Sequence, residues 1–417
     1  MKIIADLQVH SRHARATSKD LSLDNLEKWG RIRGLDLIGT GDFQHPIHRK
    51  EIESYLKDER EGILYSKSGF AFLWQTEVSL MFSQGGKKRA VHLLVFAPNK
   101  NIADKIISYL GSKGRLDYDG RPIFGISCRD FVKDLKEIDD LIEIIPAHCM
   151  TPWFGLFGSD SGFDSLKDCF LDMNEKIYAI ESGMSADPSM LYRFEELSKG
   201  GVNVVSFSDA HSFWPWRLGR EATTFEVKKL NYENIIKAIR AGEGLRSTIE
   251  TPPEYGKYHW DGHRNCNFSC SPLKTKELGK ICPVCNKSMT IGVDYRVEEL
   301  AVKKKGFMPT NAKQFLKIAP LHELISSYFG GVSLTSKKVW GVYNSLIEMF
   351  KTEFNILLDI TKKDFLDKGI NSKLVDIILL NRDGELTIKP GYDGEYGKIV
   401  YEGGIDLSKG IKQTKLF

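Results

Sequence analysis

The sequence has 417 residues, of which 41% are hydrophobic and 27% are charged, a composition typical of a globular protein with more than one domain. No apolar run approaches the roughly 20 residues that a membrane-spanning helix needs, and the opening residues, Met1-Lys2-Ile3-Ile4-Ala5-Asp6, have no signal-peptide layout. These features exclude an integral membrane protein, and we expect a cytoplasmic protein without a membrane partner.

Charge is distributed unevenly along the chain. The net charge is only +4. Between residues 257 and 317, however, there are 12 Lys and Arg residues against 5 Asp and Glu residues, a local excess of +7. This excess suits a polyanionic partner such as nucleic acid, although a solvated basic face explains the charge equally well.

Short apolar runs that end in a polar side chain recur along the first 245 residues. They are residues 2–9, 36–42, 70–79, 90–96, 141–146 and 177–180, followed by a run that starts at Val204 and ends at Asp209 and His211. Helical patterns lie between most of them, for example at 22–33, 189–198 and 232–241. Strand and helix alternating about seven times predicts a parallel α/β barrel or sheet.

Nearly every predicted strand finishes in His, Asp or Glu. In a barrel these ends meet at one face, which is where the chemistry of such folds lies. Asp209 and His211 illustrate the pattern, because side chains two residues apart at a strand end point the same way. Imidazoles and carboxylates that converge are plausible metal ligands, so the sequence predicts a metal site at the barrel mouth.

The polar strand ends resemble, in order, the motifs of PHP (polymerase and histidinol phosphatase) domains over roughly residues 1–245. The matching motifs are Asp6-Leu7-Gln8-Val9-His10-Ser11, Gly41-Asp42, Glu77, His92, Pro146-Ala147-His148, Glu181 and Ser208-Asp209-Ala210-His211. The resemblance implies a distorted seven-stranded barrel that holds two or three metal ions for phosphoester hydrolysis. The chain departs from the family in two places, where Gln8 replaces the first His of His-x-His and Phe43 replaces the His of Asp-His.

The resemblance implies a specific set of ligands. For Zn²⁺, Mn²⁺ or Mg²⁺ we expect His10, Asp42, Glu77, His92, His148, Asp209 and His211, with Gln8 and Glu181 as weaker candidates. Two metals ~4 Å apart can activate a water and neutralise the leaving oxygen, so Asp209, Glu77 and His148 are the predicted catalytic residues. Gln8 lacks the basicity of an imidazole and is expected to weaken or empty one position. His13 and His45 are expected to be exposed loop histidines, and the alternative for each is a supporting role behind the metal ligands or a contact to phosphate.

Two aromatic loops follow the predicted ligands His148 and His211. They are Thr151-Pro152-Trp153-Phe154-Gly155-Leu156-Phe157-Gly158-Ser159 and Ser212-Phe213-Trp214-Pro215-Trp216-Arg217. Exposed aromatic side chains stack on bases, and glycines let backbone approach a ligand closely. The predicted substrate contacts are stacking by Trp153, Phe154 and Trp214 and polar contacts by Ser182, Ser212 and Arg217. Ordinary packing at the barrel mouth explains the aromatic residues equally well.

Four of the seven cysteines cluster in sequence. Cys266 and Cys270 form one close pair, and Cys282 and Cys285 form a second pair eleven residues later. Two such pairs separated by a short loop suit tetrahedral Zn²⁺, and four thiolates close the shell, so the ion is predicted to be structural. Cys128, Cys149 and Cys169 lack such spacing and are predicted to lie in the core.

The last hundred residues are predicted to be mainly helical. The expected helices are residues 311–318, 321–328, 337–350 and 373–380, whereas residues 386–398 are rich in glycine and turn-like. In the tail, Gln413 and Leu416 match the first half of a peptide that binds the sliding clamp PCNA. We expect the natural chain to continue beyond Phe417 and complete this motif; a chance match of two positions is equally plausible.

A PHP-like barrel followed by a zinc element and a helical segment resembles the endonuclease Q family of DNA repair nucleases. The specific matches are Ala16-Thr17-Ser18-Lys19-Asp20, Gly39-Thr40-Gly41-Asp42-Phe43, Pro146-Ala147-His148-Cys149-Met150-Thr151-Pro152-Trp153 and the cysteine cluster. The resemblance implies a monomer that cuts double- or single-stranded DNA 5′ to hypoxanthine, uracil, xanthine or an abasic site, with the lesion flipped into a pocket.

The same resemblance suggests four divisions of the chain. They are a PHP domain at 1–250, a zinc-binding domain at 251–300, a helical DNA-binding domain at 301–405 and a tail at 406–417. Two other functions stay open, namely a PHP phosphatase that acts on a small phosphomonoester and a catalytically decayed PHP protein that only binds DNA. The zinc cluster and the basic stretch count against the first, whereas Gln8 and Phe43 leave room for the second.

Overall fold

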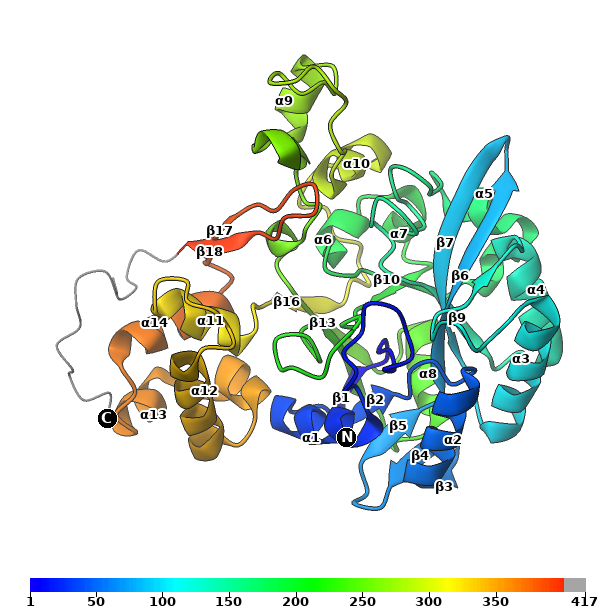
Figure 1. The fold of residues 1–417 in the computed structure, drawn as a ribbon, viewed down its shortest axis with the longest axis horizontal. Helices are drawn as coiled ribbons and strands as arrows, with labels where there is room; N and C mark the ends of the chain where they lie inside the picture. The colour runs from blue at the N-terminus through cyan, green and yellow to red at the C-terminus, as the bar shows by residue number, and fades with distance from the viewer. Residues whose placement is uncertain (401–417) are drawn as a thin grey trace.

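The computed structural model describes residues 1–400, which form a barrel, a small cysteine-rich element above it, called the zinc element after the predicted site, and a helical segment at its side (Figure 1). The predicted clamp-binding residues 413–417 lie outside the described residues. Within residues 1–400, no helix is both long and apolar enough to cross a bilayer.

The barrel is built mainly from parallel strands. The strands of the barrel wall are β1 (Lys2–Asp6), β2 (Leu37–Gly39), β5 (Ala71–Leu73), β6 (Gln75–Gln84), β7 (Lys87–Phe96), β9 (Glu143–Pro146), β10 (Ala179–Glu181) and β11 (Asn203–Val205). Strands β1, β2 and β5 pair in parallel, as do β10 and β11, whereas β7 runs antiparallel to both β6 and β9. A parallel bridge between Val9 and Ala210 closes the ring next to β1. The α/β barrel predicted from the sequence is therefore present.

Further strands extend the barrel sheet on both sides. Beyond β1 follow β12 (Ala222–Glu226), β13 (Leu245–Glu250) and β16 (Gln314–Lys317); beyond β5 follow β4 (Ile63–Ser66) and β3 (Leu56–Arg60); and β8 (Ile123–Phe124) flanks β6. Together β3, β4, β5, β2, β1, β12, β13 and β16 form one sheet of eight strands.

Amphipathic helices cover the outside of the barrel (Figure 1). They are α1 (Leu23–Arg33), α2 (Pro46–Tyr55), α3 (Lys100–Lys113), α4 (Cys128–Ile138), α5 (Leu166–Phe170), the 3₁₀ turn at Leu171–Lys176, α6 (Pro188–Leu191), α7 (Glu195–Ser198) and α8 (Tyr232–Ala241). In α4, the buried residues Cys128, Phe131, Val132 and Leu135 recur at helical spacing, and the Ser127 side chain caps the helix by accepting from Asp130 N–H.

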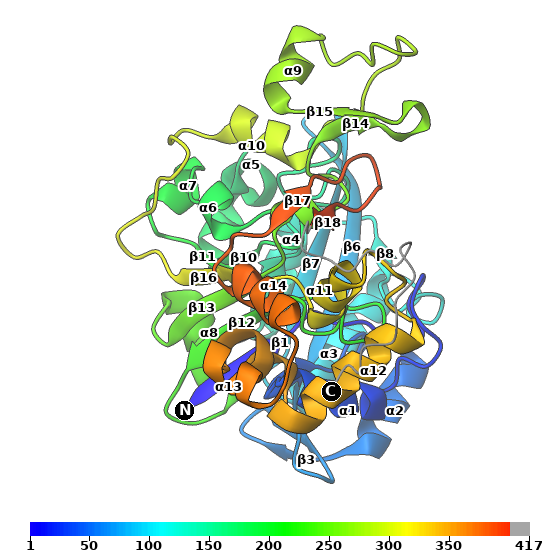
Figure 2. The same ribbon diagram turned by 90° about the vertical axis from the view of Figure 1, so that its left-hand side faces the viewer.

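The zinc element and the C-terminal segment follow the barrel. They contain a 3₁₀ turn (Pro253–Tyr255), β14 (Asp261–His263), a 3₁₀ turn (Arg264–Cys266), β15 (Phe268–Cys270), α9 (Pro272–Glu277), α10 (Val293–Leu300), α11 (Leu321–Tyr328), α12 (Lys337–Phe350), a π-helical turn (Asn355–Asp359), α13 (Lys362–Asp367), α14 (Ser372–Arg382), β17 (Thr387–Lys389) and β18 (Lys398–Val400). The β17–β18 hairpin runs back from the helices toward the zinc element (Figures 1 and 2).

Three sequence predictions are wrong at this level. Residues 311–318 contain strand β16 and not a helix, because residues 314–317 pair in parallel with β13 at the edge of the large sheet. Residues 189–198 span two short helices, α6 and α7, in place of one, and the turn-like stretch 386–398 includes most of a hairpin. A strand partner distant in sequence overrides the helical pattern at 314–317, and a short break divides the helix predicted at 189–198. The third case is local, because β17 and β18 flank residues 390–397, which form the predicted turn.

The C-terminal segment is locked to the barrel by a buried ion pair and an aromatic cluster. Arg33 of α1 donates to a Glu353 carboxylate oxygen, and both side chains are fully buried. Glu353 also accepts from Leu321 N–H at 2.8 Å and from the Tyr343 hydroxyl at 2.9 Å. Ring contacts continue across the interface through Trp29, Phe213, Trp214, Trp216, His322, Trp340 and Tyr343.

Candidate active site

Six side chains that the sequence analysis nominated converge at the barrel mouth in two groups. The ligand atoms of each group lie within 4.8 Å of one another, and the groups are His10, Asp209 and His211, and Glu77, His92 and His148. Glu77 links them, because one of its oxygens lies 3.2 Å from His10 Nε2 and the other 2.7 Å from His92 Nδ1. The arrangement has the form of a two-cation centre with a bridging carboxylate.

The hydrogen bonds of His10 indicate that a cation belongs beside it. His10 Nδ1 lies 3.1 Å from Asp42 Oδ1, so a neutral imidazole donates its one N–H there. The lone pair of Nε2 then faces Asp209 Oδ1 at 3.2 Å and Glu77 Oε2 at 3.2 Å. Three acceptors directed at one point repel each other unless a proton or a metal ion lies between them, and a divalent cation would satisfy all three.

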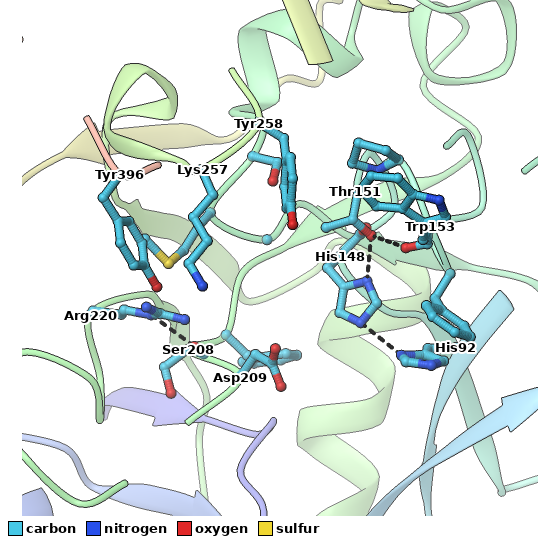
Figure 3. Close-up of a pocket in the computed structure, with 16 residues that line it drawn as sticks. His92, His148, Thr151, Trp153, Ser208, Asp209, Arg220, Lys257, Tyr258 and Tyr396 are labelled. Atoms are coloured by element: carbon cyan, nitrogen blue, oxygen red, sulfur yellow. Dashed lines mark hydrogen bonds between the residues drawn. The ribbon is translucent and has the colours of Figure 1, made fainter. Parts of the chain in front are cut away.

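The second group has the same feature. His148 Nδ1 lies 3.0 Å from Thr151 Oγ1, and its Nε2 lies 3.1 Å from His92 Nδ1 (Figure 3). Two imidazole nitrogens thus face each other beside Glu77. Arg121 Nη1 donates to Glu77 at 3.2 Å, so this carboxylate already has one cationic neighbour, which the sequence analysis did not identify.

Gln8, the departure from the His-x-His pattern, is fully buried inside the site. Its Nε2 donates to Glu77 Oε2 at 2.9 Å. Its carbonyl oxygen has no hydrogen-bond partner among residues 1–400, although it is buried. A free amide oxygen beside the ligand groups could act as a weak oxygen ligand for a hard cation.

Asp42 and Glu181 lie outside the two ligand groups that the described residues form, and each accepts hydrogen bonds from neighbouring turns. Asp42 orients His10 and also accepts from Ser11 N–H at 2.6 Å and the Ser11 hydroxyl at 2.7 Å. Glu181 accepts three backbone N–H groups, those of His148, Gly183 and Phe207. Both carboxylates hold ligand-bearing turns in place.

The ends of the ligand-bearing strands are conformationally unusual. Asp42, His148 and Asp209 have φ values of 33°, 31° and 49°, in a region that non-glycine residues rarely occupy. Gly183 has a φ of 64°, and a Cβ there would lie 2.7 Å from His148 Cβ. These sharp turns aim the side chains into the mouth, and the surrounding hydrogen bonds stabilise them.

Electrostatics set the charge of each ligand in the metal-free protein. Burial lowers the pKa of His10, but Asp42, Asp209 and Glu77 raise it by more, to well above its usual value, so a metal ion would have to displace a proton there. Burial raises the pKa of Glu77. The neighbouring Arg121, His10, His148 and His92 lower it by a larger amount, so the pKa lies well below its usual value. Burial lowers the pKa of His92 to about 3. At neutral pH the carboxylate is therefore ionised and the imidazole neutral, the states in which each coordinates a metal.

A cavity of about 440 Å³ opens directly beside these ligands (Figure 3). Its lining includes His92, His148, Thr151, Pro152, Trp153, Phe154, Gly183, Met184, Ser185, Phe207, Ser208, Asp209, Arg220, Lys257, Tyr258 and Tyr396. Of the six predicted substrate contacts, Trp153 and Phe154 are in this set. No local sequence pattern indicates Tyr396, because the β17–β18 hairpin brings it from the far end of the chain.

The other four predicted substrate contacts do not line the cavity. Trp214 is stacked on Trp216, with ring centroids 5.5 Å apart, in the interface with the C-terminal segment. The Ser182 hydroxyl is buried and donates to Glu250 at 2.9 Å. Arg217 lies over the Tyr396 ring at 5.4 Å, and Ser212 is half-buried outside the cavity. Packing of the second aromatic loop explains this segment, as the alternative interpretation held.

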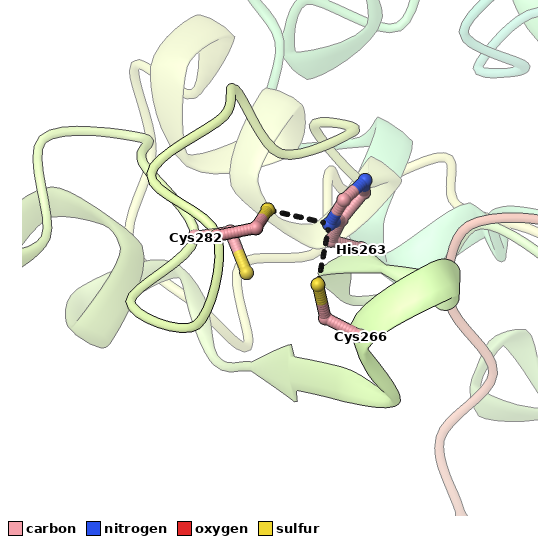
Figure 4. Close-up of side chains that lie close together, drawn as sticks. His263, Cys266 and Cys282 are labelled. Atoms are coloured by element: carbon pink, nitrogen blue, oxygen red, sulfur yellow. Dashed lines mark hydrogen bonds between the residues drawn. The ribbon is translucent and has the colours of Figure 1, made fainter.

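Three of the four predicted zinc ligands come together with a histidine. His263, Cys266, Cys282 and Cys285 bring their ligand atoms together, with His263 Nδ1 3.2 Å from the sulfurs of Cys266 and Cys285 (Figure 4). Cys270 is outside the group, and its sulfur lies 3.3 Å from Thr275 Oγ1. Cys270 packs in the same small core as the other three cysteines, so the four-cysteine set stays a prediction, and three cysteines with His263 form a second set that also suits tetrahedral Zn²⁺.

A further cluster lies next to the mouth. His13 Nε2 and His48 Nδ1 face the two oxygens of Glu51 at 3.3 and 3.1 Å, and Arg12 donates to the same carboxylate at 2.7 Å. His45 is 3% exposed and caps α2, so the expectation of an exposed histidine is wrong there. His13 is half-buried.

Comparison with known proteins gives close relatives over most of the chain. The MJ0043 C-terminal domain model matches residues 320–385. MJ0043 of Methanocaldococcus jannaschii, an uncharacterised protein, is 34% identical over 301 residues, 69% of this chain and 35% of that protein. The chain thus spans about a third of the length of this relative.

Two solved structures resemble the whole chain. The lesion-specific endonuclease PfuEndoQ from Pyrococcus furiosus has a TM-score of 0.85 and 29% identity, covering 96% of this chain and 95% of its own. Endonuclease Q in complex with a 27-mer duplex that has an abasic lesion at the active site has a TM-score of 0.85 and 30% identity, covering 96% of this chain and 97% of its own.

Proposed function

The chain belongs to the endonuclease Q family, and on that premise we propose that it is a metal-dependent DNA repair endonuclease. One observation carries the proposal: a cavity with room for a single base opens beside the ligands His92, His148 and Asp209. A nucleotide whose base entered this cavity would present its phosphate to the ligand groups. Recognition and cleavage would thus occur within one nucleotide of each other.

The finer proposal concerns the lesion. The protein cleaves the phosphodiester bond 5′ to deaminated bases (hypoxanthine, uracil or xanthine) and to abasic sites, with the lesion flipped into the cavity. Aromatic side chains support this assignment, because Trp153 and Tyr258 lie edge to face at 5.5 Å on the cavity wall and offer flat surfaces to a base.

The residues at the barrel mouth have different proposed roles. His10, Asp209 and His211 would hold one cation, Glu77, His92 and His148 would hold another, and Gln8 offers an oxygen to this centre. Bound metal ions would supply charge neutralisation for the phosphate and a water of lowered pKa. Asp42 fixes the orientation of His10, and Thr151 fixes that of His148. Arg121, which is partly exposed beside Glu77, is placed to contact a phosphate oxygen.

The basic zinc element is proposed to contribute to DNA binding and not to chemistry, since its ligand shell is complete. The C-terminal segment is proposed to bind DNA with it, because the β17–β18 hairpin joins both to the cavity. We also propose the sliding clamp as a partner through residues 413–417; this proposal depends on the sequence alone.

Cleavage of labelled duplexes tests the function and its two alternatives. The substrates are an undamaged duplex, one with a single deoxyinosine and one with an abasic site, each incubated with Mn²⁺ or Mg²⁺, with p-nitrophenyl phosphate as a small ester. We expect a nick 5′ to each lesion and none in undamaged DNA. Hydrolysis of the small ester alone would indicate a phosphatase, whereas binding without cleavage would indicate a decayed DNA-binding protein.

A further inference from the structure

Two histidines and a glutamate come together outside the cavity and outside both ligand groups of the mouth. His13 lies in the loop after β1, whereas His48 and Glu51 lie one turn apart on α2. The ligand atoms of the three side chains are within 4.8 Å of one another. Residues three apart on a helix share a face, so α2 presents an imidazole and a carboxylate together and the loop adds a second imidazole.

The hydrogen bonds of His48 leave one ring nitrogen for an ion. His48 is 1% exposed, and its Nε2 lies 2.9 Å from the Thr40 carbonyl oxygen. A carbonyl oxygen only accepts, so a neutral imidazole has its proton on Nε2 and a lone pair on Nδ1. That lone pair faces Glu51 Oε2 at 3.1 Å. Two acceptors at this distance repel each other unless a proton or a cation lies between them.

The spacing of the ligand atoms fits one small cation. Two ligands bound at ~2.1 Å and at a tetrahedral angle are ~3.4 Å apart. Glu51 Oε2 lies 3.1 Å from His48 Nδ1, and Glu51 Oε1 lies 3.3 Å from His13 Nε2. The His13 ring stacks on His45, with centroids 4.6 Å apart and planes 13° apart, so its direction is already fixed.

A fourth side chain orients the carboxylate. Arg12 Nη2 donates to Glu51 Oε1 at 2.7 Å. Carboxylates that bind metal ions are themselves held by hydrogen bonds, and this contact leaves the other oxygen of Glu51 free to coordinate. The arginine thus supports the ligand without occupying the position of the ion.

An ion can reach this group from solvent. The side chains of His13 and Glu51 are 19% and 26% exposed, so entry requires no unfolding. Glu51 and Arg12 also line a groove of about 360 Å³ on the surface. Three protein ligands leave at least one coordination position for water, in contrast with the closed shell of a four-ligand structural site.

We propose that His13, His48 and Glu51 form a further binding site for a divalent transition-metal ion, with Zn²⁺ as the preferred ion. Two imidazoles and one carboxylate suit Zn²⁺, whereas Mg²⁺ and Ca²⁺ favour sites made of oxygen atoms alone. The ion links the loop that follows β1 to α2. This inference does not rest on the proposed function, because the site requires neither DNA nor the ions of the mouth.

Anomalous diffraction at the zinc absorption edge locates the ion directly. Crystals of the wild-type protein are soaked in Zn²⁺, and the zinc element serves as the internal check that the metal has entered. We expect a peak within bonding distance of His13 Nε2, His48 Nδ1 and an oxygen of Glu51. No peak at this position, in crystals whose zinc element is occupied, overturns the proposal.

Equilibrium dialysis against Zn²⁺, with the metal counted by inductively coupled plasma mass spectrometry, tests the site in solution. His13→Phe keeps a ring to stack on His45, and Glu51→Gln keeps the shape of the side chain. Each variant should bind one Zn²⁺ fewer per chain, or bind that ion about 100-fold more weakly. Glu53→Gln removes an exposed carboxylate of the same helix and is the matched control, which should bind as many ions as the wild type.

The other outcomes distinguish a metal site from a network of ion pairs. Equal zinc content in the wild type, both variants and the control shows that Glu51 pairs only with Arg12 and with protonated histidines, and overturns the proposal. Loss of more than one ion from His13→Phe or Glu51→Gln shows that these residues support the ions of the mouth and form no separate site, which also overturns it. DNA cleavage is not a readout here, so failure of the proposed function leaves this test unaffected.

Discussion

The barrel mouth and the interface between the barrel and the C-terminal segment are both built from buried charges, yet only one of them is internally complete. At the interface, the Arg33 guanidinium donates to Glu353 and to the Gly219 carbonyl oxygen, and Glu353 accepts from Tyr343 and Leu321 as well. Burial lowers the pKa of Arg33 to about 10, so the pair stays ionised at neutral pH. Each charge there has a partner within the protein.

At the barrel mouth, several buried polar groups face one another without a complementary partner. His10 Nε2 faces two carboxylates, and two ring nitrogens of His92 and His148 face each other. The Gln8 carbonyl oxygen has no partner among residues 1–400. Buried polar groups are costly unless they are satisfied, so such a cluster needs either a proton on His10 or a bound cation. The mouth thus differs from the interface in its charges, because each charge of the Arg33–Glu353 pair has a partner within the protein whereas the acceptors at the mouth converge on one another.

The largest effect should come from removing a charge at the mouth. Asp209→Asn keeps the shape of the side chain but weakens one ligand group, and we expect single-turnover cleavage to fall about 1,000-fold while DNA affinity, measured by fluorescence anisotropy, stays close to that of the wild type. Asp172→Asn, an exposed carboxylate paired with Arg129, is the control and should behave like the wild type. Normal cleavage by Asp209→Asn would place the chemistry elsewhere.

Variants at the interface should change the stability of the protein and not its rate of DNA cleavage. Glu353→Gln leaves Arg33 as a buried charge without a counter-ion and should lower the free energy of unfolding by about 3 kcal/mol, measured by urea denaturation. The double variant Arg33→Met/Glu353→Met should recover much of this loss, because neither charge remains. A double variant less stable than Glu353→Gln would show that the ion pair has no such role.

Two variants in the zinc element distinguish the two possible sets of zinc ligands. His263→Ala should lower the zinc content by one ion per chain, measured by inductively coupled plasma mass spectrometry, whereas Cys270→Ala should retain that ion. Cleavage should change little in either variant, since this site lies outside the mouth. Loss of zinc from Cys270→Ala with retention in His263→Ala would favour the four-cysteine set.

The smallest effect concerns His322, whose two ring nitrogens have no hydrogen-bond partner among the described residues. Burial lowers its pKa to about 3 from the model-peptide 6.5. The unfolded chain therefore binds the proton first, and the folded state loses about 2 kcal/mol of stability as pH falls from 7 to 5. His322→Phe should gain about 1 kcal/mol at pH 7 and reduce that pH dependence in thermal unfolding. An unchanged pH dependence would contradict this account.

The sequence predicted which side chains converge at the barrel mouth because strand ends and side-chain alternation are local features. Asp209 and His211 lie at the end of one run, and parallel strands bring such ends together. Asp42 shows the limit of this reasoning, because pattern alone cannot distinguish a ligand from the residue that orients one. Only the geometry shows that its oxygens face His10 Nδ1 and Ser11.

Non-local features escaped the sequence analysis for physical reasons. Tyr396 reaches the cavity through a hairpin nearly two hundred residues after Asp209, and the β14–β15 hairpin brings His263 next to the cysteines, which their sequence spacing does not indicate. Trp214 has the composition of a base-stacking residue but packs against Trp340, since the C-terminal segment covers it. A run of aromatic residues indicates a surface that is buried, and only the tertiary structure shows whether a ligand or another part of the protein covers it.

Anomalous diffraction from crystals of the wild-type protein soaked in Mn²⁺ tests the central claim most directly, because it locates cations without relying on activity. If the unsatisfied acceptors at the mouth are a metal centre, two peaks should appear, one within bonding distance of His10, Asp209 and His211 and one within bonding distance of Glu77, His92 and His148, with Glu77 between them. Crystals of cleavage-competent protein that show no peak at either position, or peaks only elsewhere, would contradict the account.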